Sequence, residues 1–255
     1  MRRLLKKFAH ACLPQSPFLA GICVDYLNFV RGEDIGHPRR NGEARFQKFA
    51  LPNAKVCFDV GANKGEWTQE ALRLNPAVQI HCFEPARQAF EALRSVTWPA
   101  GVTVNHLGLS DAPGSRTLHL FKNPKLNSLH ARAGLAQGET TEEQVTVTTL
   151  DEYARSRQLG EIDFLKIDVE GEELRVLEGG RALFAARQVR FAQVEYGGTY
   201  IDARVLFKDV FAFATRHGYL VYQLHPRGWR HYPQYDPNME NFRMKNFILA
   251  RDPLP

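Results

Sequence analysis

Cysteine is scarce in this 255-residue sequence, which contains only Cys12, Cys23, Cys57 and Cys82. None of them forms a C-x-x-C pair, so their spacing predicts neither a zinc site nor a disulfide framework. Cys57 and Cys82 lie inside apolar runs typical of strands, where a free thiol behaves as a small hydrophobic group. This usage favours a reducing compartment, and we expect a cytoplasmic protein.

Long apolar runs are also absent. The run over residues 18–30 contains Asp25 and Asn28 and is shorter than the ~20 residues that a membrane span needs. The first residues begin like a signal peptide, but charged side chains and Pro14 interrupt the apolar stretch that should follow. We therefore expect neither secretion nor a span. Two interpretations of this end stay open: a helical cap packed on the domain, which we favour, and a peripheral membrane contact through residues 1–30.

No excess of one charge is spread along the chain. The formal net charge is +5, but the basic residues behind it gather before residue 50, at Arg2, Arg3, Lys6, Lys7, Arg39 and Arg40. Nucleic-acid binding would need a basic stripe across the domain, so we expect no nucleic acid partner. With 44% hydrophobic and 24% charged residues, the composition indicates an ordinary globular protein. We expect a basic helical extension over 1–45 and one domain over 46–255.

What the sequence does contain is a regular alternation of apolar strands and amphipathic helices. Strands are predicted at 56–60, 78–85, 101–109, 162–171, 188–196, 219–224 and 244–251. Strand and helix rounds of this kind indicate a parallel sheet covered on both faces. No obvious helix joins the last two strands, so they should form a hairpin with the final strand antiparallel to the rest. The fold class predicted from pattern is α/β with a seven-stranded sheet.

The alternation changes between the third and fourth of these strands. Segments 115–122 and 143–150 alternate apolar or β-branched residues with polar ones, as half-exposed antiparallel strands do. We interpret them as a β-rich insertion at the edge or top of the sheet.

The stretch VCFDVGANKGEW carries a strand through Asp59 into a turn and then a helix. Such a turn presents backbone N–H groups and a helix amino end to a polar ligand, and its glycines permit close approach. We place Gly61, Ala62, Asn63 and Gly65 in a cofactor site. The dinucleotide fingerprint G-x-G-x-x-G does not match, because Asn63 replaces the second glycine and Asp59 would repel a pyrophosphate. An NAD-dependent oxidoreductase is therefore disfavoured.

Acidic residues follow each of the first three strands. Glu84 ends the second strand at the distance from the turn at which a carboxylate reaches the two hydroxyls of a ribose. Asp59 suggests a cationic group nearby. Asp111, with Ser110 before it, could accept a hydrogen bond from an adenine amino group. An adenosine with a charged amino-acid tail meets all three demands, which predicts S-adenosylmethionine as the cofactor.

These segments also resemble a known family. The stretches FDVGANKGEWT, CFEPA, GLSDAPG, TTLDEY and IDFLKIDVEGEELRVLEGG together look like the FkbM-type methyltransferases, and the resemblance covers about residues 55–250. It implies a class I methyltransferase (Rossmann-like) fold of seven strands with the last antiparallel. It also implies methylation of an oxygen with S-adenosylmethionine, often on a sugar or a polyketide-like natural product.

Further carboxylates are expected where the fourth and fifth strands end. Asp168, Glu170 and Glu195 should converge there, and could raise one another's pKa to form a general base or hold a divalent cation such as Mg²⁺. A simpler interpretation is that Lys166 pairs with Asp168 and that Glu170 only favours a helix amino end. His225, after the sixth strand, is another candidate catalytic base.

Two loops combine aromatic, cationic and hydrogen-bonding side chains, at 121–130 and 225–238. In the second loop, Trp229, Tyr232 and Tyr235 could stack on a sugar ring, with Arg227 and Arg230 reaching an acidic group; packing on the protein core is the alternative. We expect O-methylation of a sugar or glycan hydroxyl. A non-sugar small molecule as acceptor, or a catalytically inactive cofactor-binding protein, are the alternatives. The sequence does not indicate the number of subunits.

Overall fold

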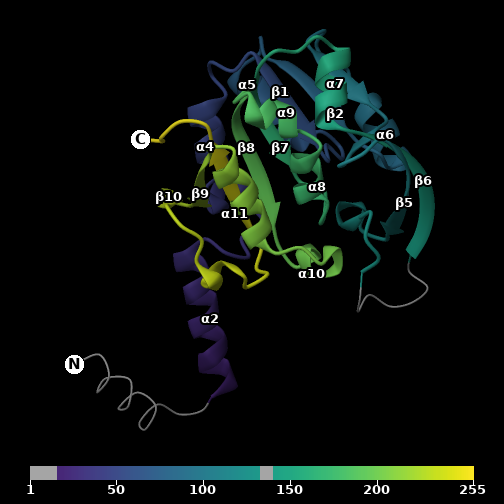
Figure 1. Cartoon of the computed structure of the whole chain (residues 1–255). Helices are drawn as coiled ribbons and strands as arrows, with labels where there is room; N and C mark the ends of the chain where they lie inside the picture. Colours follow the sequence, from purple (N-terminus) through teal and green to yellow (C-terminus); the bar gives the residue numbers. More distant parts are fainter. Residues whose placement is uncertain (1–15, 133–139) are drawn as a thin grey trace.

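The computed structural model describes residues 16–132 and 140–255, and its centre is a mixed eight-stranded sheet (Figure 1). The strand order is β10-β9-β11-β8-β7-β1-β2-β3. The bounds are β1 Val56–Val60, β2 Gln79–Phe83, β3 Val102–Asn105, β7 Ile162–Ile167, β8 Val189–Tyr196, β9 Leu220–His225, β10 Gly228–Tyr232 and β11 Lys245–Ala250. β1 pairs in parallel with β2 and β7, whereas β11 pairs antiparallel with β8 and β9. This order confirms the α/β class with an antiparallel final strand.

One strand differs from the expectation. β10 pairs antiparallel with β9 at the sheet edge, inside a segment predicted to be a loop. β9 and β11 are neighbours as predicted, but β10 and the short 3₁₀ helix Pro237–Met239 lie between them along the chain. The edge strand was missed because it is short and carries two exposed cationic or polar positions, Arg230 and His231, which read as a loop.

Helices cover both faces of the sheet. One face carries α7 Leu150–Ser156, α8 Glu173–Glu178, α9 Arg181–Ala185, α10 Thr199–Ala203 and α11 Phe207–Arg216. The other carries α4 Glu43–Ala50, α5 Glu66–Leu74 and α6 Arg87–Arg94. Successive side chains of β1 point to opposite faces of the sheet. Phe58 packs with the helices α7 to α11, and Cys57 packs with the helices α4 to α6. The parallel strands are apolar on both sides for this reason.

The expected β-rich insertion is a second sheet of three strands, in the order β4-β6-β5. Its bounds are β4 Gly108–Leu109, β5 Gly114–Phe121 and β6 Thr140–Thr148. Leu118, Val145 and Val147 pack there against Ala86 and Ala89 near the start of α6. The insertion therefore packs beside the start of α6 (Figure 1).

The amino-terminal part is helical, but its first described helix is not a packed cap. α2 Pro17–Arg31 has no buried residue and projects from the body (Figure 1), so the favoured interpretation is wrong for this helix. Within 16–132 and 140–255, no helix has the length and apolar character that crossing a membrane requires. α3 Pro38–Asn41 and α4 follow, and Phe46 of α4 packs on the rings of Phe164 and Phe191. The expected boundary at residue 45 therefore lies inside a helix that covers the sheet.

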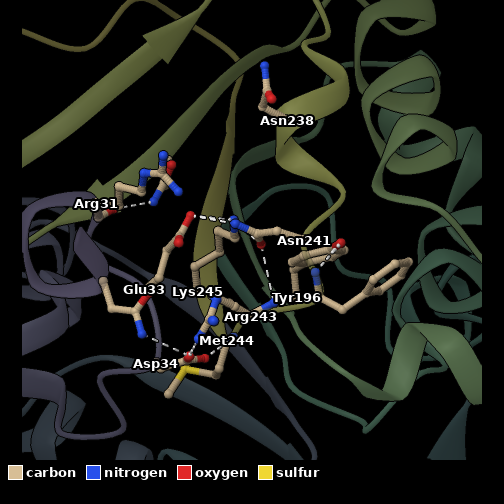
Figure 2. Close-up of polar contacts among 12 residues, drawn as sticks. Arg31, Glu33, Asp34, Tyr196, Asn238, Asn241, Arg243, Met244 and Lys245 are labelled. Atoms are coloured by element: carbon tan, nitrogen blue, oxygen red, sulfur yellow. Dashed lines mark hydrogen bonds and ion pairs between the residues drawn. The ribbon is translucent and has the colours of Figure 1, made fainter. Parts of the chain in front are cut away.

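Buried polar contacts fix the junction after α2 to the segment that leads into β11. Figure 2 shows Glu33 and Lys245 reaching one another, with Nζ and Oε1 2.9 Å apart and both side chains buried. Asp34 accepts from the backbone N–H of Met244 at 2.9 Å and pairs with Arg243 at 2.5 Å. Removing one partner of a buried ion pair costs about 3–5 kcal/mol, so the root of α2 is held firmly.

Candidate active site at the carboxyl ends of the strands

A cavity of about 470 Å³ lies where β1, β2, β7 and β8 end. Its wall includes Gly61 after β1, Glu84 after β2, Asp168 after β7 and Glu195 from β8. The carboxyl ends of parallel strands are where open α/β sheets bind ligands, and the volume falls within the range of small-molecule sites.

The glycine turn is shaped by the protein's own packing. Gly61 has a φ of +83°, and a Cβ there would lie 1.8 Å from the carbonyl oxygen of Asp168. The N–H groups of Gly61 and Ala62 both donate to the carbonyl of Phe83 at 3.0 Å. A Cβ on Gly65 would meet the Trp98 ring at 2.7 Å. The N–H groups of Gly61 and Ala62 thus hold β1 to β2, which corrects the expectation that they face a ligand.

Glu84 lies in the cavity wall in a fixed position. Its carboxylate accepts from the N–H of Asn63 at 2.8 Å and from the N–H of Ala86 at 2.9 Å. Asn63 donates from a left-handed backbone with a φ of 48°, as its place in the turn suggested. Only 6% of Glu84 is exposed, and burial raises the pKa of its carboxyl to about 7. Lone pairs remain on both oxygens for donors inside the cavity.

Asp59 lies beneath this wall. It is fully buried and accepts from Thr68 Oγ1 at 2.8 Å and from Lys166 Nζ at 3.3 Å. The ammonium also lies 3.2 Å from Asp168. Burial disfavours the charge of Lys166, but Asp168 and Asp59 outweigh it and raise its pKa above the ordinary value. Asp59 therefore positions Lys166 and does not line the cavity, unlike the predicted ligand-facing carboxylate.

The three predicted acids do converge. Asp168, Glu170 and Glu195 each offer an oxygen within 4.8 Å of the others, and all three line the cavity. Burial opposes ionisation of Asp168, but Lys166 and a hydrogen bond with Glu195 lower its pKa. Burial and the neighbouring Asp168 charge raise the pKa of Glu195 well above its ordinary value. The two shifts are opposite in direction, so Glu195 is the member of the pair that favours its protonated form.

Glu170 occupies a constrained turn and pairs with a residue of the insertion. Its φ is 56°, and its carbonyl accepts from Ser128 Oγ at 2.6 Å. The carboxylate pairs with Arg132 at 2.5 Å. Burial and Asp168 raise the pKa of Glu170 to about 7, against the lowering effect of Arg132. The carboxylate of Glu173 supports the turn by accepting from the N–H groups of Val169 and Gly171, each at 3.0 Å.

Ser110 and Asp111 do not line the cavity. Ser110 is buried and donates to Glu172 Oε1 at 2.6 Å, and half-exposed Asp111 lies 4.0 Å from Arg116. β4 pairs with β6 of the second sheet instead of continuing the first, which directs these residues away. Gly108 and Leu109 form the wall there, and the adenine contact of Asp111 stays a prediction.

His225 is also absent from the cavity wall. Its Nε2 lies 2.7 Å from the carbonyl of Val30, and its Nδ1 accepts from the N–H of Arg227 at 3.3 Å. Both ring nitrogens are thus occupied by backbone groups. His225 therefore connects α2 to the sheet, which corrects its assignment as a catalytic base.

The two candidate acceptor loops have different outcomes. The first contributes Lys125 and Asn127 to the cavity wall. In the second, Trp229 packs at the edge of the Phe46 ring, and Tyr235 donates to Glu240 at 2.9 Å. None of the second loop's aromatic or arginine side chains lines the cavity, so the predicted sugar-stacking platform is corrected to core and edge packing.

The amino-terminal segment supplies a wall that the sequence did not predict. His37, Asn41, Glu43 and Gln47 all line the cavity. Gln47 Oε1 has no hydrogen-bond partner, although its side chain is almost fully buried. Across the wall, Trp67 Nε1 is likewise buried and unpaired. Trp67 belongs to the VCFDVGANKGEW stretch, whereas no local motif marks the residues of the amino-terminal segment.

The main sheet is mostly parallel, and carboxylates line the cavity at its strand ends. Residues 59–221, more than half of the chain, match the family model described as the Methyltransferase FkbM domain. The chain belongs to this family, and the protein is a methyltransferase.

Individual similar proteins share a third or less of the aligned residues with this chain. The chain is 33% identical over 197 residues to 31-O-demethyl-FK506 methyltransferase FkbM of Streptomyces tacrolimicus, covering 61% of this chain and 75% of that protein. It is 27% identical over 154 residues to 2-O-methyltransferase NoeI of Sinorhizobium fredii (strain NBRC 101917 / NGR234), covering 55% and 63%. The crystal structure of methyltransferase FkbM from Methylobacillus flagellatus KT aligns with a TM-score of 0.46 at 16% identity, covering 77% of this chain and 44% of that chain.

Proposed function

We propose that this methyltransferase uses S-adenosylmethionine to methylate a hydroxyl oxygen. The observation that carries the proposal is Glu84, a carboxylate held by two backbone N–H groups in the cavity wall at the end of β2. Its free lone pairs suit the two ribose hydroxyls of the cofactor. When bound, the cofactor supplies an electrophilic methyl group.

The unpaired buried atoms support a place for the amino-acid end of the cofactor. Trp67 Nε1 is a donor without an acceptor, which suits a carboxylate, and Gln47 Oε1 is an acceptor without a donor, which suits an ammonium. Glu43, which accepts from Gln47 Nε2 at 3.2 Å, adds negative charge beside it. A buried polar atom left unpaired costs about 1–3 kcal/mol, so a ligand that pairs these atoms gains affinity.

Glu170 is the proposed general base. With a pKa of about 7, it is ionised in a large fraction of molecules at neutral pH and still basic enough to accept a hydroxyl proton. Asp168, kept ionised by Lys166, is the weaker base and orients the acceptor hydroxyl together with protonated Glu195.

A divalent cation in the same cluster is a less suitable alternative. The three carboxyl oxygens lie close enough together to ligate one, but Lys166 already neutralises Asp168 and Arg132 already neutralises Glu170. Glu195 would also have to lose its proton. We therefore propose proton transfer through Glu170 without a required metal.

A sugar or glycan hydroxyl is the proposed acceptor, with a non-sugar small molecule as the alternative. The acceptor side of the cavity presents carboxylates together with Asn127, Asn246 and Lys125, which suits a ligand with several hydroxyls. The names of the two curated relatives both specify O-methylation, which supports an oxygen as the methyl acceptor. Free, buried Cys57 and Cys82 support a reducing, cytoplasmic location.

Two measurements test this function. S-adenosylhomocysteine should raise the unfolding temperature of the protein and NAD should not, because only the former provides the ribose and amino-acid ends together. Transfer of a labelled methyl group to sugar-containing extracts should then identify the acceptor. Protection by NAD alone would overturn the cofactor assignment. Tight cofactor binding without transfer to any hydroxyl-bearing acceptor would favour the inactive binding protein.

A further inference from the structure

The exposed helix α2 has the properties of a surface-binding element. Six large apolar side chains fall within an arc of about 120° of an ideal helix: Phe18, Leu19, Ile22, Tyr26, Phe29 and Val30. All six are exposed, Phe18 to 75% and Tyr26 to 66%. Asp25 and Asn28 lie outside this arc, as do two further exposed apolar side chains, Val24 and Leu27. An apolar stripe of this size left in water marks an interaction site.

The positive charge of the segment before α2 indicates the chemistry of the partner that this helix binds. Arg2, Arg3, Lys6 and Lys7 precede the helix in the sequence, and no acidic residue occurs before Asp25. A second copy would bring the same positive charges to the stripe, so self-association is electrostatically opposed. An anionic lipid surface attracts these cations and accepts the apolar side chains at the same time.

The length of α2 excludes a membrane span and favours a helix that lies on the membrane surface. α2 has 15 residues, which is about 22 Å of helix against a hydrocarbon core of about 30 Å. We propose that α2, together with the basic residues ahead of it, docks the enzyme on an anionic phospholipid bilayer. This goes beyond the proposed chemistry and does not depend on it.

The junction after α2 connects the apolar stripe of the helix to the active site. Gln223 Nε2 donates to the carbonyl of Arg31 at 2.8 Å, and the Glu33–Lys245 pair follows directly (Figure 2). Gly36 already lines the cavity, four residues after Gly32. Four extended residues reach at most about 14 Å, so docking through α2 places the cavity wall close to the bilayer. An acceptor carried on a lipid would then be within reach.

Vesicle sedimentation with the full chain tests the docking. Binding to phosphatidylcholine vesicles should be weak, should increase when phosphatidylglycerol is added, and should decrease at high salt. The double variant Phe18→Ser/Ile22→Ser should lower the partition coefficient about tenfold or more, because two buried apolar side chains are lost from the lipid contact. Replacing Arg2, Arg3, Lys6 and Lys7 by Gln should abolish the preference for anionic vesicles.

Controls separate docking from folding and self-association. Ile201→Ser/Leu206→Ser removes two exposed apolar side chains elsewhere and should leave vesicle binding unchanged. The α2 variants should keep the unfolding temperature, because α2 buries no side chain. Absence of wild-type binding to anionic vesicles, or binding that Phe18→Ser/Ile22→Ser leaves intact, would overturn the proposal. A dimer seen by light scattering that the same variant dissociates, without vesicle binding, would assign the stripe to a second copy.

Discussion

The cavity has two sides that are built in different ways. The turn side consists of Gly61–Gly65 and Glu84, and its polar groups are bound by backbone N–H and carbonyl groups of adjacent strands. The acid side consists of Asp168, Glu170 and Glu195, whose charges are set by other side chains, chiefly Lys166 and Arg132. Both sides carry titratable carboxyls, but backbone N–H groups hold the turn-side Glu84 in place, whereas the charges of the acid side depend on other side chains. The comparison teaches that the turn side provides a binding surface of fixed geometry, and the acid side a surface whose charge is set by its side-chain partners.

The largest effect is expected from Gly61→Ala on the turn side. The new methyl group would lie 1.8 Å from the Asp168 carbonyl oxygen, at a φ of +83°. The free energy of unfolding, measured by urea denaturation, should decrease by about 4 kcal/mol or more. Gly160→Ala is the matched control, since no atom lies within 4 Å of the Cβ position there. Equal stability of the two variants would show that the turn is not fixed by this contact.

Glu170→Gln should have the next largest effect, and on the other side of the cavity. Loss of the general base should lower turnover by about 10²- to 10⁴-fold, with little change in affinity for S-adenosylhomocysteine. Steady-state kinetics and calorimetric titration measure the two quantities. Glu91→Gln, an exposed carboxylate on α6, should change neither. Parallel loss of turnover and affinity would make Glu170 a structural residue.

The pH dependence sharpens the same assignment. The pKa of Glu170 is about 7, and only the ionised form accepts a proton, so turnover should increase as pH rises through about 7. Arg132→Gln should move this midpoint to higher pH, because Arg132 lowers the pKa of Glu170. A midpoint unchanged in Arg132→Gln would assign the titration to another group.

Glu84→Gln should produce a smaller loss, confined to cofactor binding. Affinity for S-adenosylhomocysteine should weaken by about 1–3 kcal/mol, since ribose hydroxyls lose a charged acceptor. Because hydroxyl donors bind the ionised carboxylate, whose pKa burial raises to about 7, wild-type affinity should increase as pH rises through that value. Calorimetry measures both. Glu66→Gln, an exposed carboxylate on the same wall, should change affinity by less than about 0.5 kcal/mol.

The smallest effect is expected from metal removal. Ion pairs and the protonated form of Glu195 already satisfy the acid side, so EDTA treatment should leave turnover unchanged. Activity lost with EDTA and restored by Mg²⁺ would instead show that a cation displaces these pairs.

The contrast between the two sides also explains what the sequence could predict. The strands, the insertion and Glu84 follow from local periodicity and short spacing, because neighbouring strands determine where they lie. The convergence of Asp168, Glu170 and Glu195 was predictable for the same reason, since they lie at the ends of two adjacent strands, β7 and β8.

The partners of these acids were not predictable in this way. Arg132 pairs with Glu170 across the insertion, and Gln47 reaches the wall from the amino-terminal segment. Neither contact follows from a local pattern, because each depends on how distant elements pack. Strand-end position alone does not show whether a residue points to the cavity: His225 bonds to the last turn of α2, and Asp111 follows a strand that pairs within the second sheet.

The most direct test of the account is a crystal structure of the protein with S-adenosylhomocysteine. We predict that both ribose hydroxyls lie within hydrogen-bond distance of Glu84, with the sulfur facing Asp168 and Glu170. A nucleoside bound elsewhere, or a ribose that leaves Glu84 without contact, would contradict the account.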